Sequence, residues 1–246
     1  MTPLEYDYNI RFDFPRRPES APAVAEKFLK TLDSLSRIDA FFTDWRIINT
    51  RGRSSRPLAE VRSEFPAIVA RNVVRDGQGP SPEEGYHASA AVGKFEDPRS
   101  ADFSVRAGGK LENYGKLEFG SWRVRPDPAI VTYPRYRAAL LAINAEWQPT
   151  WACAYAFKSD YYEFPLVPDA PLFPYTRYHI PWLAYLSAPL ALGLQLPRGI
   201  GSERTPDGGL LMTVTQERLD PINPEYLRLA RIVVETMVAR AGDPSG

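Results

Sequence analysis

TYPRYRAALLAINAEWQPTWACAYAFK, residues 132–158, predicts a helix that runs almost directly into a buried strand. Thr132 is placed to cap the helix, and Pro134 falls in the first turn, where a missing N–H breaks no helical hydrogen bond. Four apolar side chains recur at helical spacing and predict one buried face: Tyr136, Leu140, Ile143 and Trp147. That face needs another element to cover it.

The strand is predicted from the alternation that follows the helix. From Trp151 to Phe157, alanine occupies every second position, and the positions between hold aromatic residues or cysteine. A period-two pattern that is apolar on both faces is typical of a central strand. Small side chains on one face let a helix approach closely. We therefore expect the helix to pack back on its own strand across a very short connection.

The N-terminal part of the chain predicts a β-α-β arrangement. Residues 6–14, YDYNIRFDF, alternate apolar and polar side chains, which indicates a strand covered on one face. Ser20 is placed to cap a helix with apolar residues at helical spacing, and Trp45–Asn49 reads as a second strand.

The middle and end of the chain add helices and antiparallel strands. Residues 57–75 have helical spacing interrupted by Pro66, which predicts a kink or two short helices. Residues 86–125 read as an antiparallel meander, and residues 180–196 as a pair of buried strands. A further strand is expected over residues 210–216, and a last helix opens near Asn223.

These patterns predict an α+β fold: a mixed, mainly antiparallel sheet or sheets with amphipathic helices packed on one face. We expect residues 1–246 to form a single domain, with lobes at 1–128 and 129–246 as the alternative.

Composition excludes several classes of protein. Thirty basic and thirty acidic residues leave no net charge, so the whole molecule is not a generic nucleic-acid binder. One cysteine excludes an internal disulfide framework. The N-terminal residues interleave charges with apolar side chains, unlike a signal peptide, and no apolar run reads as a membrane span. We expect a cytoplasmic protein that does not bind membranes.

No set of residues predicts catalysis, a metal site or a cofactor. His87 and His179 are the only histidines and have no Glu or Cys at metal-ligand spacing. Cys153 lies in the predicted central strand, where burial raises a thiol pKa and withholds the nucleophilic thiolate. The glycine pairs lack the context of a phosphate-binding loop.

Two charged stretches suggest contacts with a partner. Residues 46–75 hold seven arginines against Glu60 and Glu64, which indicates either a nucleic-acid or acidic-protein surface or a solvated helix face. The second stretch is an acidic, aromatic loop, whose candidate partner-binding residues are Asp160, Tyr161, Tyr162, Glu163 and Asp169. Tyrosines beside carboxylates suit an interface with a basic protein, and a solvated loop is the alternative.

Several stretches together resemble the fifty-second family of bacterial polymorphic-toxin immunity proteins. They are IDAFFTDW at 38–45, residues 133–157, PWLAYL at 181–186 and TPDGGLLMTVT at 205–215. The resemblance implies a cytoplasmic, non-catalytic protein that binds and neutralises a cognate toxin effector domain. In this family the toxin is often a nuclease of restriction-endonuclease type, delivered between cells by a contact-dependent system such as type VI secretion. The resemblance assigns no interface residues.

Two other classes of function stay open on the sequence alone. Glu146, Asp160 and Glu163 could hold a divalent metal for phosphodiester chemistry. A structural adaptor in a phage-like or secretion assembly would fit the proline-rich composition equally well. A neighbouring toxin gene, metal-dependent turnover and self-assembly into particles separate the three classes.

Overall fold

The fold is organised around one ten-stranded sheet in which every neighbouring pair of strands is antiparallel. It is taken from a computed structural model that describes residues 6–49, 54–77, 79–94, 96–110, 113–120, 124–157 and 179–241. In spatial order the strands are β11 (Gly201–Arg204), β12 (Leu210–Thr213), β10 (Ile180–Leu186), β9 (Trp151–Phe157), β1 (Asp7–Phe14), β8 (Asn113–Phe119), β7 (Ala101–Ala107), β6 (Tyr86–Val92), β2 (Arg46–Asn49) and β3 (Ser54–Pro57). The predicted α+β class with a mainly antiparallel sheet is confirmed.

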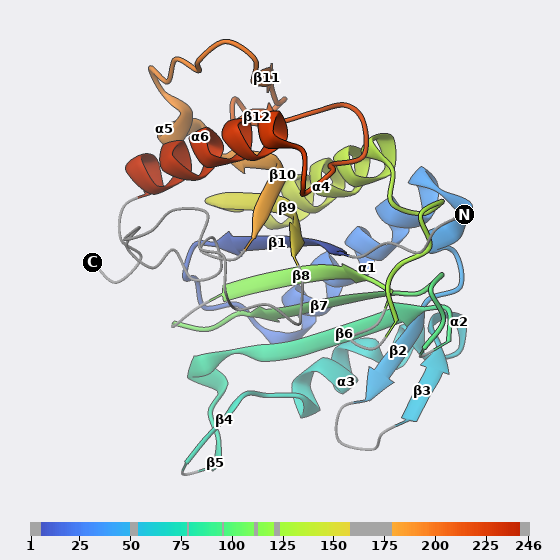
Figure 1. The fold of residues 1–246 in the computed structure, drawn as a ribbon. Helices are drawn as coiled ribbons and strands as arrows, with labels where there is room; N and C mark the ends of the chain where they lie inside the picture. Colours follow the sequence, from blue (N-terminus) through green and yellow to red (C-terminus); the bar gives the residue numbers. More distant parts are fainter. Residues whose placement is uncertain are drawn as a thin grey trace.

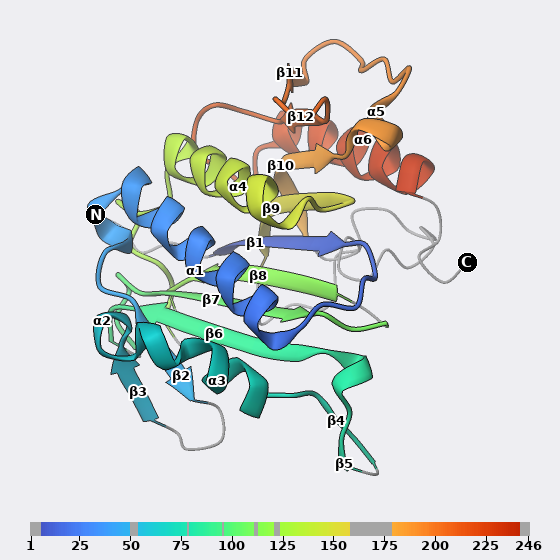
Figure 2. The same cartoon turned by 180° about the vertical axis from the view of Figure 1, so that it is seen from behind.

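Helices lie on both sides of this sheet, but unequally. Three helices cover one face: α1 (Ala21–Ile38), α3 (Phe65–Arg71) and α4 (Tyr133–Trp147). The last helix, α6 (Pro224–Ala241), packs on β10 from the opposite side (Figures 1 and 2). The remaining elements are short: α2 (Leu58–Val61), α5 (Ala188–Ala191), the 3-10 turns Ala40–Phe42, Arg62–Glu64 and Pro82–Glu84, and the strand pair β4 (Arg75–Asp76) and β5 (Gly79–Pro80).

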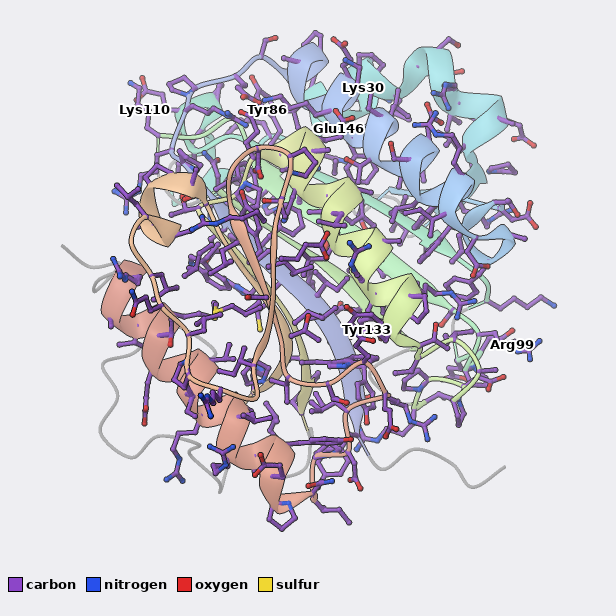
Figure 3. The ribbon with its side chains drawn as sticks, turned by 90° about the horizontal axis from the view of Figure 1, so that it is seen from above. Lys30, Tyr86, Arg99, Lys110, Tyr133 and Glu146 are labelled. Atoms are coloured by element: carbon purple, nitrogen blue, oxygen red, sulfur yellow. The ribbon has the colours of Figure 1, made fainter. Side chains whose placement is uncertain are left out.

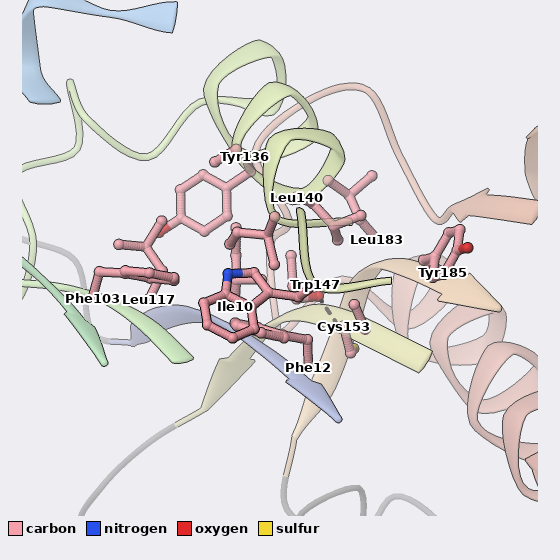
Figure 4. Close-up of a cluster of buried hydrophobic side chains, with 14 of the residues drawn as sticks. Ile10, Phe12, Phe103, Leu117, Tyr136, Leu140, Trp147, Cys153, Leu183 and Tyr185 are labelled. Atoms are coloured by element: carbon pink, nitrogen blue, oxygen red, sulfur yellow. Dashed lines mark hydrogen bonds between the residues drawn. The ribbon is translucent and has the colours of Figure 1, made fainter. Parts of the chain in front are cut away.

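Helix α4 and strand β9 pack against each other as predicted. The four predicted inward residues of α4 are fully buried, and the alanines of β9 lie beneath the helix at 0% exposure. Trp147 donates its indole N–H to Thr31 of α1 at 2.9 Å, and the Tyr136 hydroxyl donates to the Tyr8 carbonyl at 2.8 Å. Aromatic and aliphatic side chains fill the layer between α4 and the sheet (Figure 4).

The ends of α4 differ in part from the prediction. Thr132 occupies the cap position with extended backbone, but its side chain makes no capping hydrogen bond. At the other end Gln148 adopts a left-handed conformation, with φ at 47°, which lets the chain turn from the helix toward β9.

The other elements confirm most of the expected pattern. Ser20 caps α1 by accepting the Ala23 N–H, and the stretch interrupted by Pro66 forms two short helices, α2 and α3. The predicted strand pair at 180–196 is wrong, because only β10 forms and Pro189 then starts the short helix α5. Proline suits a first helical turn, where no N–H is needed.

Candidate functional site

Burial shifts the pKa values of the cysteine and histidines considered for catalysis. Cys153 is 6% exposed, and burial raises the pKa of its thiol far above the usual range, so the thiolate does not form near neutral pH. Burial, and then the charge of Arg11, lowers the pKa of His179 to about 3. Burial and the charge of Arg106 also lower the pKa of His87. Both histidines are therefore neutral at physiological pH.

No cluster of His, Cys, Asp and Glu suited to a metal occurs within the described part of the chain. Glu146 lies on the outer side of α4, beside Lys30 of α1 (Figure 3). The two carboxylates considered with it, Asp160 and Glu163, lie outside the described residues.

The arginine-rich stretch carries its own counter-charges. Arg62 forms an ion pair with Asp33 of α1 at 2.5 Å, and Arg56 lies 3.4 Å from Glu64. These pairs lie at the exposed surface of the helical layer, which favours the interpretation of this stretch as a solvated face.

The predicted partner-binding residues, Asp160, Tyr161, Tyr162, Glu163 and Asp169, also lie outside the described residues. The points where the chain enters and leaves that segment are described. Phe157 ends β9, His179 directly precedes β10, and their rings lie edge to face at 5.5 Å. Tyr155 packs on His179 with ring centres 4.1 Å apart. Tyr155, Phe157 and His179 therefore form an aromatic cluster at one end of β9 and β10, which we call the anchor.

Beside this anchor, the sheet presents a polar surface that no helix covers in the described ranges (Figure 1). Alternate residues of β1, β8, β7 and β6 point away from α1, α3 and α4. We call this surface the open face. Its members are Arg11 and Asp13 on β1, Tyr114, Lys116 and Glu118 on β8, Asp102, Ser104 and Arg106 on β7, and His87, Ser89 and Ala91 on β6.

The open face does not include the first half of β1. Asp7 and Asn9, which belong to the same side of β1, are buried at 7% and 4% exposure. Asp7 forms an ion pair with Arg125, which follows β8. The accessible part of this side is thus formed by β8, β7, β6 and the second half of β1.

Most charges on the open face are matched by opposite charges or rings. Arg11 lies 3.5 Å from Asp13 and stacks over the Tyr114 ring at 5.0 Å. Arg106 binds Glu84 at 3.0 Å. Contacts of this kind are expected on a solvated sheet surface, where opposite charges on neighbouring strands stabilise the pairing.

One pair of facing residues on neighbouring strands has like charges instead of opposite ones. The strand register places Asp102 of β7 directly opposite Glu118 of β8. Lys116 lies 2.7 Å from Glu118, whereas Asp102 has no ion pair within the described ranges and accepts only a long hydrogen bond, 3.4 Å, from Ser89. Burial, and then the charge of Glu118, raises the pKa of Asp102 to about 6. Two carboxylates thus share one lysine at the middle of the open face.

Sequence reasoning missed this surface, although a signal for it was present. ADFSVRA at 101–107 and NYGKLEF at 113–119 alternate strictly between apolar and polar residues. The pattern gives the polar side of each strand. Pairing Asp102 with Glu118 also requires the register between the two strands, which the pattern does not give.

The fold defines an α+β protein in which one sheet face is covered by helices and the other presents a broad polar surface. Residues 13–243 match the family Immunity protein 52, Imm52, and the chain belongs to that family. The predicted resemblance is confirmed at the level of the family.

The fold is also found in a solved structure. The chain is similar to the Pseudomonas aeruginosa T6SS protein PA0821, with a TM-score of 0.56 and 16% identity, over 97% of this chain and 73% of that one. No curated protein matches the sequence. In the described ranges, no helix has both the length and the apolar composition required to cross a bilayer.

Proposed function

We propose that this protein is a non-catalytic, cytoplasmic immunity protein that neutralises a cognate toxin effector domain, a nuclease, by forming a stoichiometric complex with it. The carrying observation is the match of residues 13–243 to an immunity protein family. The name of the similar Pseudomonas protein supports a toxin of a type VI secretion system. We propose that residues 1–246 act as one domain, since strands of both halves join one continuous sheet through the pairing of β9 with β1.

The proposed action is by occupancy. A protein that covers a nuclease site needs a specific interface of about 1,600 Å² with a few strong anchors, and it needs no group of tuned reactivity. A nuclease surface that grips phosphate is basic, so an acidic, aromatic contact suits it. We therefore propose the stretch from Asp160 to Asp169 as part of the interface, with Tyr161 and Tyr162 as anchors.

The test measures binding between this protein and the toxin domain encoded beside its gene, together with survival of cells that express the toxin. Reversing Asp160 and Glu163 to lysine should slow association at low salt and weaken protection, because loop charges steer the encounter. Truncating Tyr161 or Tyr162 to alanine should speed dissociation instead. Thermal unfolding should stay nearly unchanged in all four variants.

Two outcomes would contradict the proposal at different levels. Unchanged binding and protection in every variant would remove the loop as the interface. If the parent protein neither binds nor neutralises the neighbouring toxin, the immunity function itself fails for that pair.

Metal-dependent hydrolysis of a phosphodiester by the purified protein, abolished by Glu146→Gln, would favour the enzyme alternative. Assembly into large particles would favour the adaptor.

A further inference from the structure

The facing carboxylates of Asp102 and Glu118 on the open face lower the stability of the fold. A surface whose only role is contact with water would not need this pair. Like charges directly opposite each other on neighbouring strands destabilise the pairing. Lys116 is already 2.7 Å from Glu118, and no second cation pairs with Asp102 in the described ranges. The other charged contacts, Arg11 with Asp13 and Arg106 with Glu84, bring opposite signs together. The cross-strand row of Glu118 and Asp102 continues through Ala91 to Arg46 of β2, but the Arg46 guanidinium donates to Ser55 and leaves Asp102 without an ion pair in the described ranges.

The same row leads to the anchor of the proposed toxin-binding segment. Across the sheet, the register aligns Tyr155 of β9 with Asn9 of β1, Asn9 with Glu118, and Glu118 with Asp102. Neighbouring strands are about 4.8 Å apart, so Asp102 lies roughly 14 Å from Tyr155 along this row. One partner in a standard interface buries about 800 Å², a patch roughly 28 Å across when square. An interface centred between Tyr155 and Asp102 covers both residues inside its rim without being unusually large.

We propose that the open face is the second part of the toxin-binding surface and that a lysine or arginine of the toxin docks between Asp102 and Glu118. This inference rests on the proposed immunity function and deepens it by naming a surface and the chemistry of its partner. The cation would supply the ion pair that Asp102 lacks in the described part of the chain. Docking would also remove water from the half-buried Asp102, which strengthens a charge-assisted hydrogen bond.

The partner chemistry follows from charge complementarity over both parts of the surface. The segment from Asp160 to Asp169 has an excess of acid, and the Asp102 row has an excess of acid as well. A basic protein surface matches both parts, whereas a nucleic acid would meet repulsion at each. A small metal ion is a weaker match, because it would need more oxygen ligands than two carboxylates on an open sheet supply.

Asp102→Asn tests the proposal while keeping the shape of the side chain. We expect the dissociation constant for the neighbouring toxin domain to rise about thirtyfold or more, mainly through faster dissociation, as for truncation of a desolvated charge pair. Glu118→Gln is the second variant, and it should weaken binding by a smaller factor because Glu118 is shared with Lys116. Glu26→Gln is the matched control, since Glu26 is an exposed acid of α1, paired with Lys30 on the helix-covered side. It should change binding less than about twofold.

A pH series separates a direct charge contact from a shape effect. The docked cation requires ionised Asp102, so the parent should bind more weakly as the pH falls from 7.5 to 5.5. That loss should be much smaller in Asp102→Asn, whereas Glu26→Gln should follow the parent.

Parent-like binding by both open-face variants, with the parent itself binding, would overturn this inference and leave the immunity function standing. Equal losses in the variants and the Glu26→Gln control would also overturn it, because they would indicate a general charge effect. Failure of the parent to bind would remove the proposed function, and this inference with it.

Discussion

The two faces of β7 place very different side chains a single residue apart. Phe103 and Val105, 0% and 3% exposed, pack under the helices, whereas Asp102 and Ser104 point to the uncovered side. The backbone and its hydrogen bonds are common to both faces. The difference shows that one strand can serve stability with half its residues and recognition with the other half. Variants on the two faces should therefore separate loss of folding from loss of protection.

The largest effect is expected on the covered face, from Leu140→Ala. Leu140 is fully buried between α4 and the sheet, so its truncation leaves a cavity and should cost about 2–5 kcal/mol of unfolding free energy. The measurement is the urea midpoint. Leu141→Ala is the control on the same helix, because Leu141 is only partly buried and should lose clearly less. Equal midpoints for the parent and Leu140→Ala would refute the assigned inward face.

A middle-sized effect is expected at the border between the two regions, from Cys153→Ser. Cys153 shares the outward side of β9 but is buried, and its thiol donates a long hydrogen bond, 3.5 Å, to the Ala154 carbonyl. A buried hydroxyl is more costly to desolvate than a thiol, so we expect a loss of about 1–3 kcal/mol. Toxin protection at a permissive temperature should be retained. A folded Cys153→Ser protein without protection would extend the functional surface into β9.

The third effect is expected on the open face, and its sign is reversed, because this variant should gain stability. The folded-state pKa of Asp102, about 6, lies above the usual 3.8, so the folded protein holds a proton that the unfolded chain releases between these values. Stability from this group is present at low pH and is lost as the pH rises from about 4 to 6. Asp102→Asn should lack that loss and be more stable than the parent at pH 7.5, by about 1–3 kcal/mol, because the folded and unfolded pKa values of Asp102 differ by roughly two.

Urea midpoints at pH 4.5 and 7.5 measure this difference. If Asp102→Asn is destabilised at pH 7.5 instead, Asp102 supports the fold and the separation of the two faces fails at this residue.

The covered face was predictable because burial leaves a pattern in the sequence. The inward residues of α4 and the alanines of β9 are apolar at periods of 3.6 and 2, and both elements formed where the pattern placed them. The outermost strands were missed for the opposite reason. All four residues of β11, GSER, are exposed, so no apolar period marks the strand, and β3 reads SSRP.

The open face was only half predictable. The alternation in residues 101–119 gives its composition, but opposition of Asp102 and Glu118 depends on the turn that fixes the register of β7 against β8. The apolar run at 180–196 led to a wrong prediction of two strands, of which only β10 forms. Hydrophobicity indicated burial there, and Pro189 decided that part of it is helical.

The position of β1 determines when a new copy becomes useful. β1 is made first, yet it lies between β8 and β9, and its Asn9 carboxamide oxygen waits for the N–H of Phe119, 110 residues later. At roughly 5 to 20 residues per second, the ribosome takes about 5 to 20 s to supply that partner, and longer to supply β9. Until then Ile10, Phe12 and Phe14 have no sheet to join. The central part of the sheet therefore closes only after more than half of the chain has been made, and a partial chain cannot present the complete open face.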